Sequence, residues 1–241
     1  QRFNARHPDL LQYLTDEVIR QQPEDVRTFL WQSSVLNRLS GPLCDALTGR
    51  TDGQQVLQQL EQANIFVVPQ DPDRLWYRYH LLFAEFLRTR LLDMVGESHT
   101  RELHRRAADW YLTNGQTADA IEHLLQAQAY EEVADCLEAR FSDWSLNVLW
   151  GTLREWVERI PKEVMQKRPR LCTMAAWVLI NSEGGLADHL FARTVDYLGL
   201  ASRALQGADR SETTVRESLG VIAAVRTALA PWAPRRQSPQ C

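Results

Sequence analysis

The stretch from Trp76 to Leu87 constrains the fold most, because its hydrophobic period changes within a few residues. In its first part aromatic residues alternate with Arg78, which is typical of a half-buried strand. In its second part the apolar residues have helical spacing. His80 lies at the junction. The sequence therefore predicts a strand that runs directly into a helix, with a small domain before the junction and stacked helices after it.

The residues before this junction predict several short helices followed by a β-hairpin. Pro23, Gly41-Pro42, Gly49 and Asp52-Gly53 mark helix starts and ends, and a turn is expected at 70–73. Helices followed by a hairpin are the pattern of a winged helix domain, which we predict for residues 1–96. The expected elements are helices at 9–20, 23–36, 43–47 and from Gly53, strands at 65–68 and 75–79, and a helix from His80 to about Met94.

The residues after about Thr100 predict pairs of helices. The segment 114–121 resembles 183–190, and the offset from Gly115 to Gly184 is 69 residues, about twice the 34-residue period of tetratricopeptide repeats. A degenerate middle copy is expected near 151–156. Such a helical hairpin cannot bury its apolar face alone, so we predict tetratricopeptide-like stacked helices over residues 97–230. The expected helices lie at 103–114, 118–127, 187–205 and 212–229, between a polar break at 96–98 and a disordered tail at 231–241.

Charge and composition argue against several protein classes. The formal net charge is −4 and the pI is about 5.9, which argues against direct nucleic-acid binding, because phosphate contacts supply most non-specific affinity. No apolar run approaches the roughly 18–20 residues of a membrane span. No basic segment followed by an apolar core marks a signal peptide. The chain opens on Gln1 rather than Met, which suggests a processed chain or a fragment.

The cysteines are too widely spaced for a short-loop zinc site. They predict a reduced, cytosolic chain, with three small buried residues and an exposed thiol at the end of the chain. These residues are Cys44, Cys136, Cys172 and finally Cys241.

No catalytic motif is present in the sequence. It contains no G-x-x-x-x-G-K-[ST], G-x-S-x-G or G-x-G-x-x-G pattern. His99 and His104 are five apart, which on a helix points them away from each other, so we expect no metal site. Glu122 and His123 are interpreted as a solvated surface. The aromatic residues of the second half, among them Trp110, Trp156 and Trp177, are interpreted as core wedges between helices, with a ligand groove as the alternative.

His80 is the one polar residue for which the sequence favours a functional role. One interpretation is a partly buried histidine that caps its helix. The other rests on its position at the end of a strand and the start of a helix, where free N–H groups and the helix dipole favour anions.

The chain resembles the MalT-like, LuxR-type, ATP-dependent transcriptional regulators, which are signal-transduction NTPases of the STAND class. The likeness covers roughly residues 9–205, and its most specific motif is Tyr77-Arg78-Tyr79-His80 with Leu82-Phe83. Further matching residues are Tyr13-Leu14 with Glu17-Val18, Gln22-Pro23, Phe29-Leu30 with Ser33-Ser34-Val35-Leu36, Leu43-Cys44-Asp45-Ala46-Leu47-Thr48-Gly49, and Leu103-His104-Arg105-Arg106-Ala107-Ala108-Asp109-Trp110-Tyr111.

The resemblance implies a role in switching. In that family a nucleotide-binding domain precedes the winged helix and a LuxR-type helix-turn-helix ends the chain. Neither is recognisable here, so we expect an internal fragment without its own cofactor. ATP or ADP is implied for the intact regulator. The implied partners are the upstream nucleotide-binding domain, a small-molecule or protein inducer on the helical repeats, and further copies of the regulator. Related NTPases carry Met-His-Asp at the same junction, which implies an ADP-phosphate contact for His80, although Leu81 replaces the acid.

The sequence thus predicts a regulatory and sensor segment of a bacterial transcription activator. The alternative is a stand-alone helical-repeat adaptor that binds a protein partner. A winged-helix DNA binder ranks below both, because the helix at 43–47, which we interpret as the recognition helix, has no Lys or Arg and contains Asp45. An enzyme ranks last, for want of a catalytic constellation.

Overall fold

The structure is a computed structural model that describes residues 17–146, 150–182, 188–206 and 212–232. The chain divides into two compact units, a first unit of Gln1–Gln128 and a second unit of Ala129–Cys241. Within the described ranges the structure is mainly helical, with one antiparallel hairpin. The expected helix at 9–20 lies outside the described residues except for residues 17–20, which are helical. The tail after Trp232 also lies outside them.

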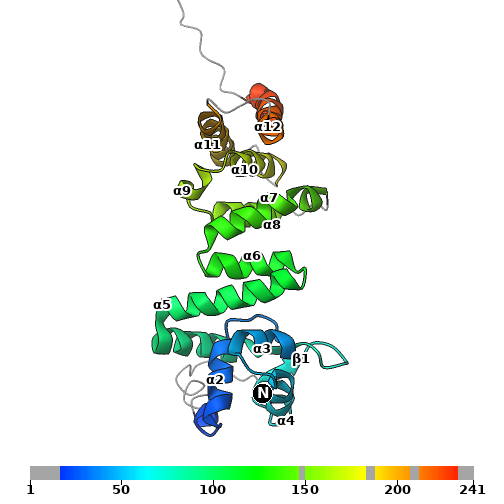
Figure 1. Cartoon of the computed structure of the whole chain (residues 1–241), viewed down its shortest axis with the longest axis vertical. Helices are drawn as coiled ribbons and strands as arrows, with labels where there is room; N and C mark the ends of the chain where they lie inside the picture. Colours follow the sequence, from blue (N-terminus) through cyan, green and yellow to red (C-terminus); the bar gives the residue numbers. More distant parts are fainter. Residues whose placement is uncertain (1–16, 147–149, 183–187, 207–211, 233–241) are drawn as a thin grey trace, which may run out of the picture. The chain divides into compact units, whose positions relative to one another are not determined.

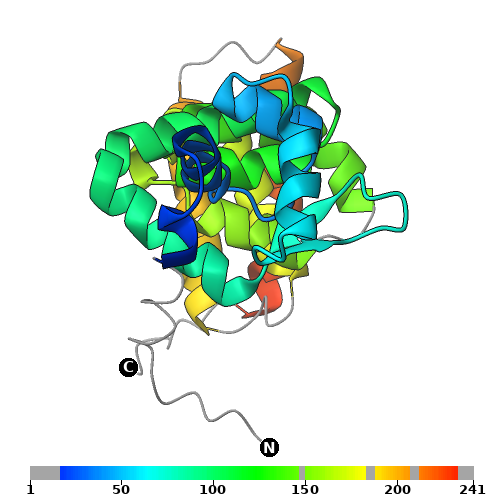
Figure 2. The same ribbon diagram turned by 90° about the horizontal axis from the view of Figure 1, so that it is seen from below.

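The first unit opens with the winged helix arrangement (Figure 1). Its helices are α2 (Glu24–Ser33), α3 (Gly41–Thr48) and α4 (Gly53–Gln62), and its strands are β1 (Val67–Pro69) and β2 (Tyr77–Tyr79). The strands pair antiparallel with Val68 opposite Arg78, and a bridge from Leu39 to Tyr77 extends the pairing. Figure 2 shows the loop of the hairpin extending away from the helices. The winged helix predicted from the sequence is confirmed, with shorter strands than expected.

Local chemistry explains where these elements begin and end. Gly49 ends α3 in the left-handed conformation at φ +75°, which glycine adopts without a Cβ clash. The Asp71 carboxylate accepts hydrogen bonds from the backbone N–H groups of Leu75 (3.1 Å) and Trp76 (2.7 Å) and so closes the hairpin loop. In the core, the Tyr79 hydroxyl lies 2.7 Å from Ser33 Oγ, which ties β2 to the end of α2.

The expected position of the recognition helix is wrong. The helix that directly precedes the hairpin is α4, and the segment 43–47 belongs to α3, one helix earlier. The sequence also predicted the helix from Gly53, but the recognition role was assigned to 43–47 instead of to the helix next to the hairpin. The α4 sequence GQQVLQQLEQ contains no Lys or Arg, and its Glu61 forms an ion pair with Arg74 at 3.0 Å. The correct helix is therefore as poor in positive charge as the one we had assigned.

The helix α5 (Leu81–Thr113) carries the chain out of the winged helix and into a helical hairpin with α6 (Thr117–Gln126). Its hydrogen-bonded run contains one residue with non-helical dihedral angles, Gly96, at φ 72° and ψ 176°. The expected break at 96–98 therefore lies where the helix bends. Gly115, at φ +73°, makes the corner between α5 and α6. The compact unit continues past the bend to Gln128, and the domain boundary at residue 96 stays a prediction.

The second unit consists of helices in its described ranges. They are α7 (Tyr130–Leu146), α8 (Trp150–Glu158), α9 (Lys162–Met165), α10 (Pro169–Asn181), α11 (Asp188–Ala204), α12 (Thr213–Leu229) and the 3-10 turn η1 (Ala230–Trp232). Figure 1 shows α10 in the middle, and it packs against the other α-helices of this unit. Almost every α10 side chain from Leu171 to Leu179 is buried, as expected of a helix that is apolar on all sides.

Some of the aromatic residues expected to pack in the core between helices do so. Trp156 is 2% exposed and Tyr111 is 4% exposed, so both are core residues. Trp110 and Trp177 are half-buried. The expected repeat copy at 183–190 falls largely outside the described residues, and the tetratricopeptide-like character of these helices stays a prediction.

Arg168 should contribute measurably to the second unit, because it joins the start of α10 to three carboxylates of α7. Its guanidinium lies 2.9 Å from Glu131, 2.6 Å from Asp135 and 3.5 Å from Glu138. Two of these carboxylates are largely exposed, so we expect Arg168→Met to lower the free energy of unfolding by only about 1 kcal/mol. Urea unfolding at low and high salt measures this, with Lys167→Met as the control. An unchanged stability at low salt would contradict it.

Candidate functional site

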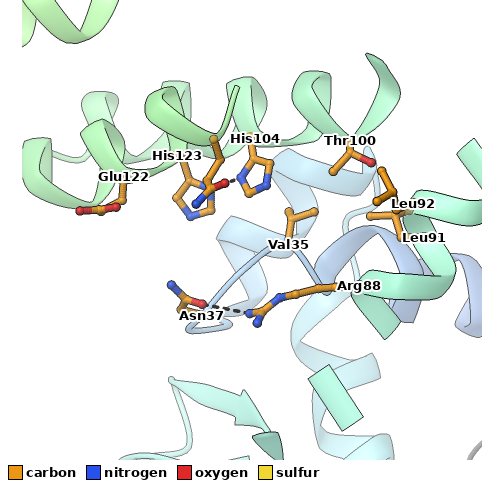
Figure 3. A pocket seen from close by; sticks show the side chains of 10 residues that line it. Val35, Asn37, Arg88, Leu91, Leu92, Thr100, His104, Glu122 and His123 are labelled. Carbon is orange, nitrogen blue, oxygen red and sulfur yellow. Dashed lines mark hydrogen bonds between the residues drawn. The ribbon is translucent and has the colours of Figure 1, made fainter. Parts of the chain in front are cut away.

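A cavity of about 330 Å³ lies in the first unit at the bend of α5 (Figure 3). It is bounded by the segment after α2, by α5 on both sides of Gly96, and by α6. Its apolar wall consists of Val35, Leu91 and Leu92, and its polar wall of Asn37, Arg88, Thr100, His104, Glu122, His123 and Gln126. Because its lining comes from both sides of Gly96, a change in the bend would change the shape of the cavity.

Two histidines form the buried polar centre of this cavity. His104 Nδ1 on α5 lies 2.9 Å from His123 Nδ1 on α6, and the ring of Tyr111 stacks on His123 with centroids 5.4 Å apart. Burial lowers the pKa of His104 to about 4, helped by the charge of Arg88. Burial also lowers the pKa of His123 to about 3, with further contributions from His104 and then Arg88. Both rings are therefore neutral at pH 7.

The short contact fixes the tautomers of the pair. A single proton lies between the two Nδ1 atoms, so one ring is protonated at Nδ1 and leaves its Nε2 as an acceptor. The other ring must then carry its proton at Nε2 and can donate it. Within the described residues neither Nε2 has a protein partner. The histidine pair thus offers one hydrogen-bond donor and one acceptor.

The interpretation of Glu122 and His123 as a solvated surface is wrong for His123, which is 6% exposed. Glu122 is half-buried. The helical period held the signal, because His123 lies three residues after the buried Ala120 and four before the buried Ala127. Its partner could not be found from local sequence, since the two histidines are 19 residues apart on different helices.

Arg88 joins the two sides of the cavity. Its Nε–H donates to the Ser34 carbonyl oxygen at 2.8 Å, and its Nη2 donates to the Leu36 carbonyl at 3.3 Å and to Asn37 Oδ1 at 2.9 Å. These acceptors follow the end of α2, where a helix leaves carbonyl groups without intrahelical partners and where the helix dipole favours a cation. Arg88 therefore satisfies the end of α2 from α5, and it has no ion pair within the described residues.

His80 lies apart from the cavity, at the junction of β2 and α5. Its backbone N–H donates to the Phe66 carbonyl at 2.8 Å, and its carbonyl accepts from the N–H of Ala84 at 2.9 Å. The side chain is exposed and makes no capping hydrogen bond, so the interpretation of His80 as a partly buried capping residue is wrong. Its neighbours Phe66 and Leu81 are 37% and 62% exposed. The imidazole is thus free to contact a molecule that lies on this face.

The other candidate ligands do not gather. His99 is exposed, whereas His104 points into the cavity. Within the described ranges no three His, Cys, Asp or Glu side chains are arranged for a metal ion. Cys44 and Cys172 are fully buried and Cys136 is half-buried, while Cys241 lies outside the described residues. Burial raises the pKa of the Cys44 thiol far above its ordinary value, so this thiol is unreactive.

Gly96 should be costly to replace, because its dihedral angles are accessible essentially only to glycine. A Cβ at this position would meet no atom within 4 Å, so the cost comes from the backbone alone. We expect Gly96→Ala to lower the free energy of unfolding of the first unit by about 1–3 kcal/mol.

Hydrogen exchange of α5 and α6 checks this prediction. Gly151→Ala is the control, because Gly151 lies within α8 and also has open space at its Cβ position. Equal protection in Gly96→Ala and wild type would show that the bend is not a constrained conformation.

No helix of the described residues has the length and apolar character needed to cross a membrane.

Comparison with known proteins agrees with the winged helix fold. Residues 15–99 match the family model of the MalT winged helix domain. The chain is 32% identical over 169 residues to the serine/threonine-protein kinase PknK of Mycobacterium tuberculosis. This match covers 70% of this chain and 15% of the kinase. It is 35% identical over 183 residues to the HTH-type transcriptional regulator MalT of Serratia proteamaculans. This match covers 73% of this chain and 19% of that regulator.

A third relative covers more of the chain. MalT of Cronobacter sakazakii is 29% identical over 213 residues, which is 85% of this chain and 22% of that protein. The chain thus spans between 15% and 22% of the length of these relatives. The resemblance to MalT-like regulators is confirmed, because residues 15–99 match the winged helix domain of the MalT type.

Proposed function

We propose that this chain is the regulatory and sensor segment of a bacterial, LuxR-type, ATP-dependent transcription activator. In this proposal the winged helix and the helices after it transmit a signal and bind other proteins. Catalysis and promoter binding belong to other parts of the intact regulator, which acts in the cytoplasm. The observation that carries the proposal is a MalT winged helix whose helix before the hairpin has no positive charge and whose α5 leads directly into a helical hairpin.

The charge distribution favours a regulatory role over a DNA-binding one. A winged helix that reads DNA places basic side chains on the helix before the hairpin, and α4 offers only glutamines and one glutamate as its polar residues. The whole chain carries a formal charge of −4, which repels phosphate. The sequence also lacks a P-loop, so we expect no ATP hydrolysis by this chain alone.

The proposed partners follow from the same assignment. The upstream nucleotide-binding domain would rest on the face of the winged helix that carries His80, and ADP would be its cofactor. The residues there fit an anion, since the imidazole of His80 is exposed at the N-terminus of α5 and Arg78 is exposed two positions earlier. An inducer on the helices and self-association of the regulator complete the proposal.

His80→Ala in the intact regulator tests the switching role. A charge-assisted hydrogen bond is worth roughly 1.5–3 kcal/mol, so its loss should weaken ADP binding about tenfold to a hundredfold. Because ADP can hold a resting state only through differential contacts, reporter transcription without inducer should rise. ADP dissociation, melting temperature and reporter activity are measured together.

His99→Ala is the matched control, because His99 is also an exposed histidine of the first unit and lies on α5. A lower melting temperature with an unchanged ADP dissociation rate would mean that His80 is only structural. Sequence-selective DNA binding by the isolated chain at moderate salt would contradict the proposed division of labour.

A further inference from the structure

A second cavity, of about 250 Å³, lies in the second unit between the segment 160–165 and one face of α11. Its floor is apolar, formed by Ile160, Met165 and Leu200, which are 6%, 0% and 8% exposed. Arg193, Tyr197 and Leu200 follow one another at helical spacing, so a single face of α11 supplies one whole wall. The cavity is therefore a built feature of the helix packing, with an apolar floor.

The rim of this cavity carries an excess of positive charge. Lys162, Arg193 and Arg203 line it, against the single carboxylate of Asp196. Arg193 is partly neutralised, since its Nη1 donates to Glu158 at 2.8 Å. Lys162 and Arg203 have no ion-pair partner within the described residues. Like charges around one cavity repel each other, and an anion between them removes that cost.

Arg203 and Arg193 line the cavity from the two ends of the α11 face. Arg203 Nη1 would lie 3.4 Å from a Cβ atom at Gly199, so its side chain leans back by one turn toward the helix N-terminus. From the other end, Arg193 Nη2 lies 3.4 Å from the Tyr197 hydroxyl. Two guanidinium groups thus approach the same cavity from opposite ends of the α11 face.

We infer that this cavity binds a small organic anion, with its apolar body on the floor and its phosphate or carboxylate between Arg203 and Lys162. The bidentate fork of arginine suits both oxyanion groups. The inference goes beyond the proposed function and does not depend on it, because it uses only contacts of the second unit. The regulator could switch as proposed with this cavity empty, and the cavity could bind its ligand in a chain with another role.

Calorimetry on the whole chain with phenyl phosphate, phenylacetate and inorganic phosphate tests the inference. We expect phenyl phosphate or phenylacetate to bind and to exceed inorganic phosphate in affinity, because only the first two cover the apolar floor. The stronger of the two identifies the oxyanion group. Arg203→Met should weaken binding of that probe at least about tenfold, the effect of losing one charge-assisted contact.

Asp196→Asn gives the discriminating result, because it should tighten binding of the same probe by about threefold when one like charge leaves the rim. A destabilised fold cannot produce tighter binding.

Arg170→Met, which removes an exposed cation of the same unit outside this cavity, should leave probe binding unchanged. The inference is overturned if neither aromatic probe binds at about 10 mM. At that concentration only a ligand whose binding free energy is weaker than roughly 3 kcal/mol goes undetected. Equal binding by the Arg203→Met and Arg170→Met variants would also overturn it.

Discussion

Acidification from pH 7 to about 4 should destabilise the first unit by several kcal/mol, up to about 3 kcal/mol for each of His104 and His123. Both side chains are neutral in the folded unit, where their pKa values are about 4 and about 3. In the unfolded chain they titrate near 6.5. Between these values the unfolded chain binds more protons than the folded one. The stabilisation is therefore complete above about pH 6.5 and is lost as the pH falls toward 4.

The surroundings of the pair make its protonation unfavourable. Arg88 faces it across the cavity with a fixed positive charge, and Tyr111 covers His123 with a neutral ring. Burial and the charge of Asp119 raise the pKa of the Tyr111 hydroxyl to about 12, so the ring stays neutral. Glu122 lines the same cavity and is the one carboxylate among its lining residues. Protonating the accepting ring at Nδ1 would also remove the acceptor that holds the two rings together.

A double variant separates this effect from ordinary acid unfolding by carboxylates. In His104→Asn with His123→Asn, each amide places a polar atom near the former Nδ1 position, so one hydrogen bond can persist without a titrating group. Hydrogen exchange read on peptides of α5 and α6 gives the local stability at several pH values between 7 and 4. As the pH falls, we expect the local stability to drop steeply in wild type and less steeply in the double variant. Parallel curves would show that the pair does not titrate in this range.

The winged helix was predictable because its signals are local. Gly49 and the 70–73 turn each punctuate the chain within a few residues, and the period change at His80 marks a strand next to a helix. The bend at Gly96 was also visible, since Gly96, Glu97 and Ser98 form a small, polar break in an otherwise helical pattern. These features depend on backbone sterics, which one residue type can dictate without help from distant residues.

The cavity at the bend was not predictable, because its parts come from separate elements. Arg88 and its acceptor Ser34 are 54 residues apart, and His104 and His123 are 19 apart. The burial of His123 depends on the helix that packs against it. The local sequence Glu122-His123 looks polar and does not reveal which helix that is. The same reasoning explains α4, whose role depends on its position before the hairpin rather than on its composition.

Arg88→Met should lower the free energy of unfolding of the first unit by about 2–3 kcal/mol. The methionine keeps much of the apolar stem but loses the donors to the Ser34 and Leu36 carbonyl groups, which belong to buried residues. Carbonyl groups left without a donor account for most of this cost, since a buried acceptor without a partner costs about 1–3 kcal/mol. Arg88→Lys should fall between, because one ammonium cannot reproduce the planar fork that spans two carbonyls.

A second readout distinguishes the charge of Arg88 from its hydrogen bonds. Its positive charge helps to lower the pKa values of both His104 and His123, so Arg88→Met should raise them and make the first unit less sensitive to acid. Imidazole resonances followed by NMR from pH 7 to 3 report this shift directly. Arg78→Met is the control, because Arg78 is exposed on β2 away from the cavity. If Arg88→Met lowers stability while both histidine pKa values stay in place, Arg88 acts only as the cap of α2, and burial alone holds the pair neutral.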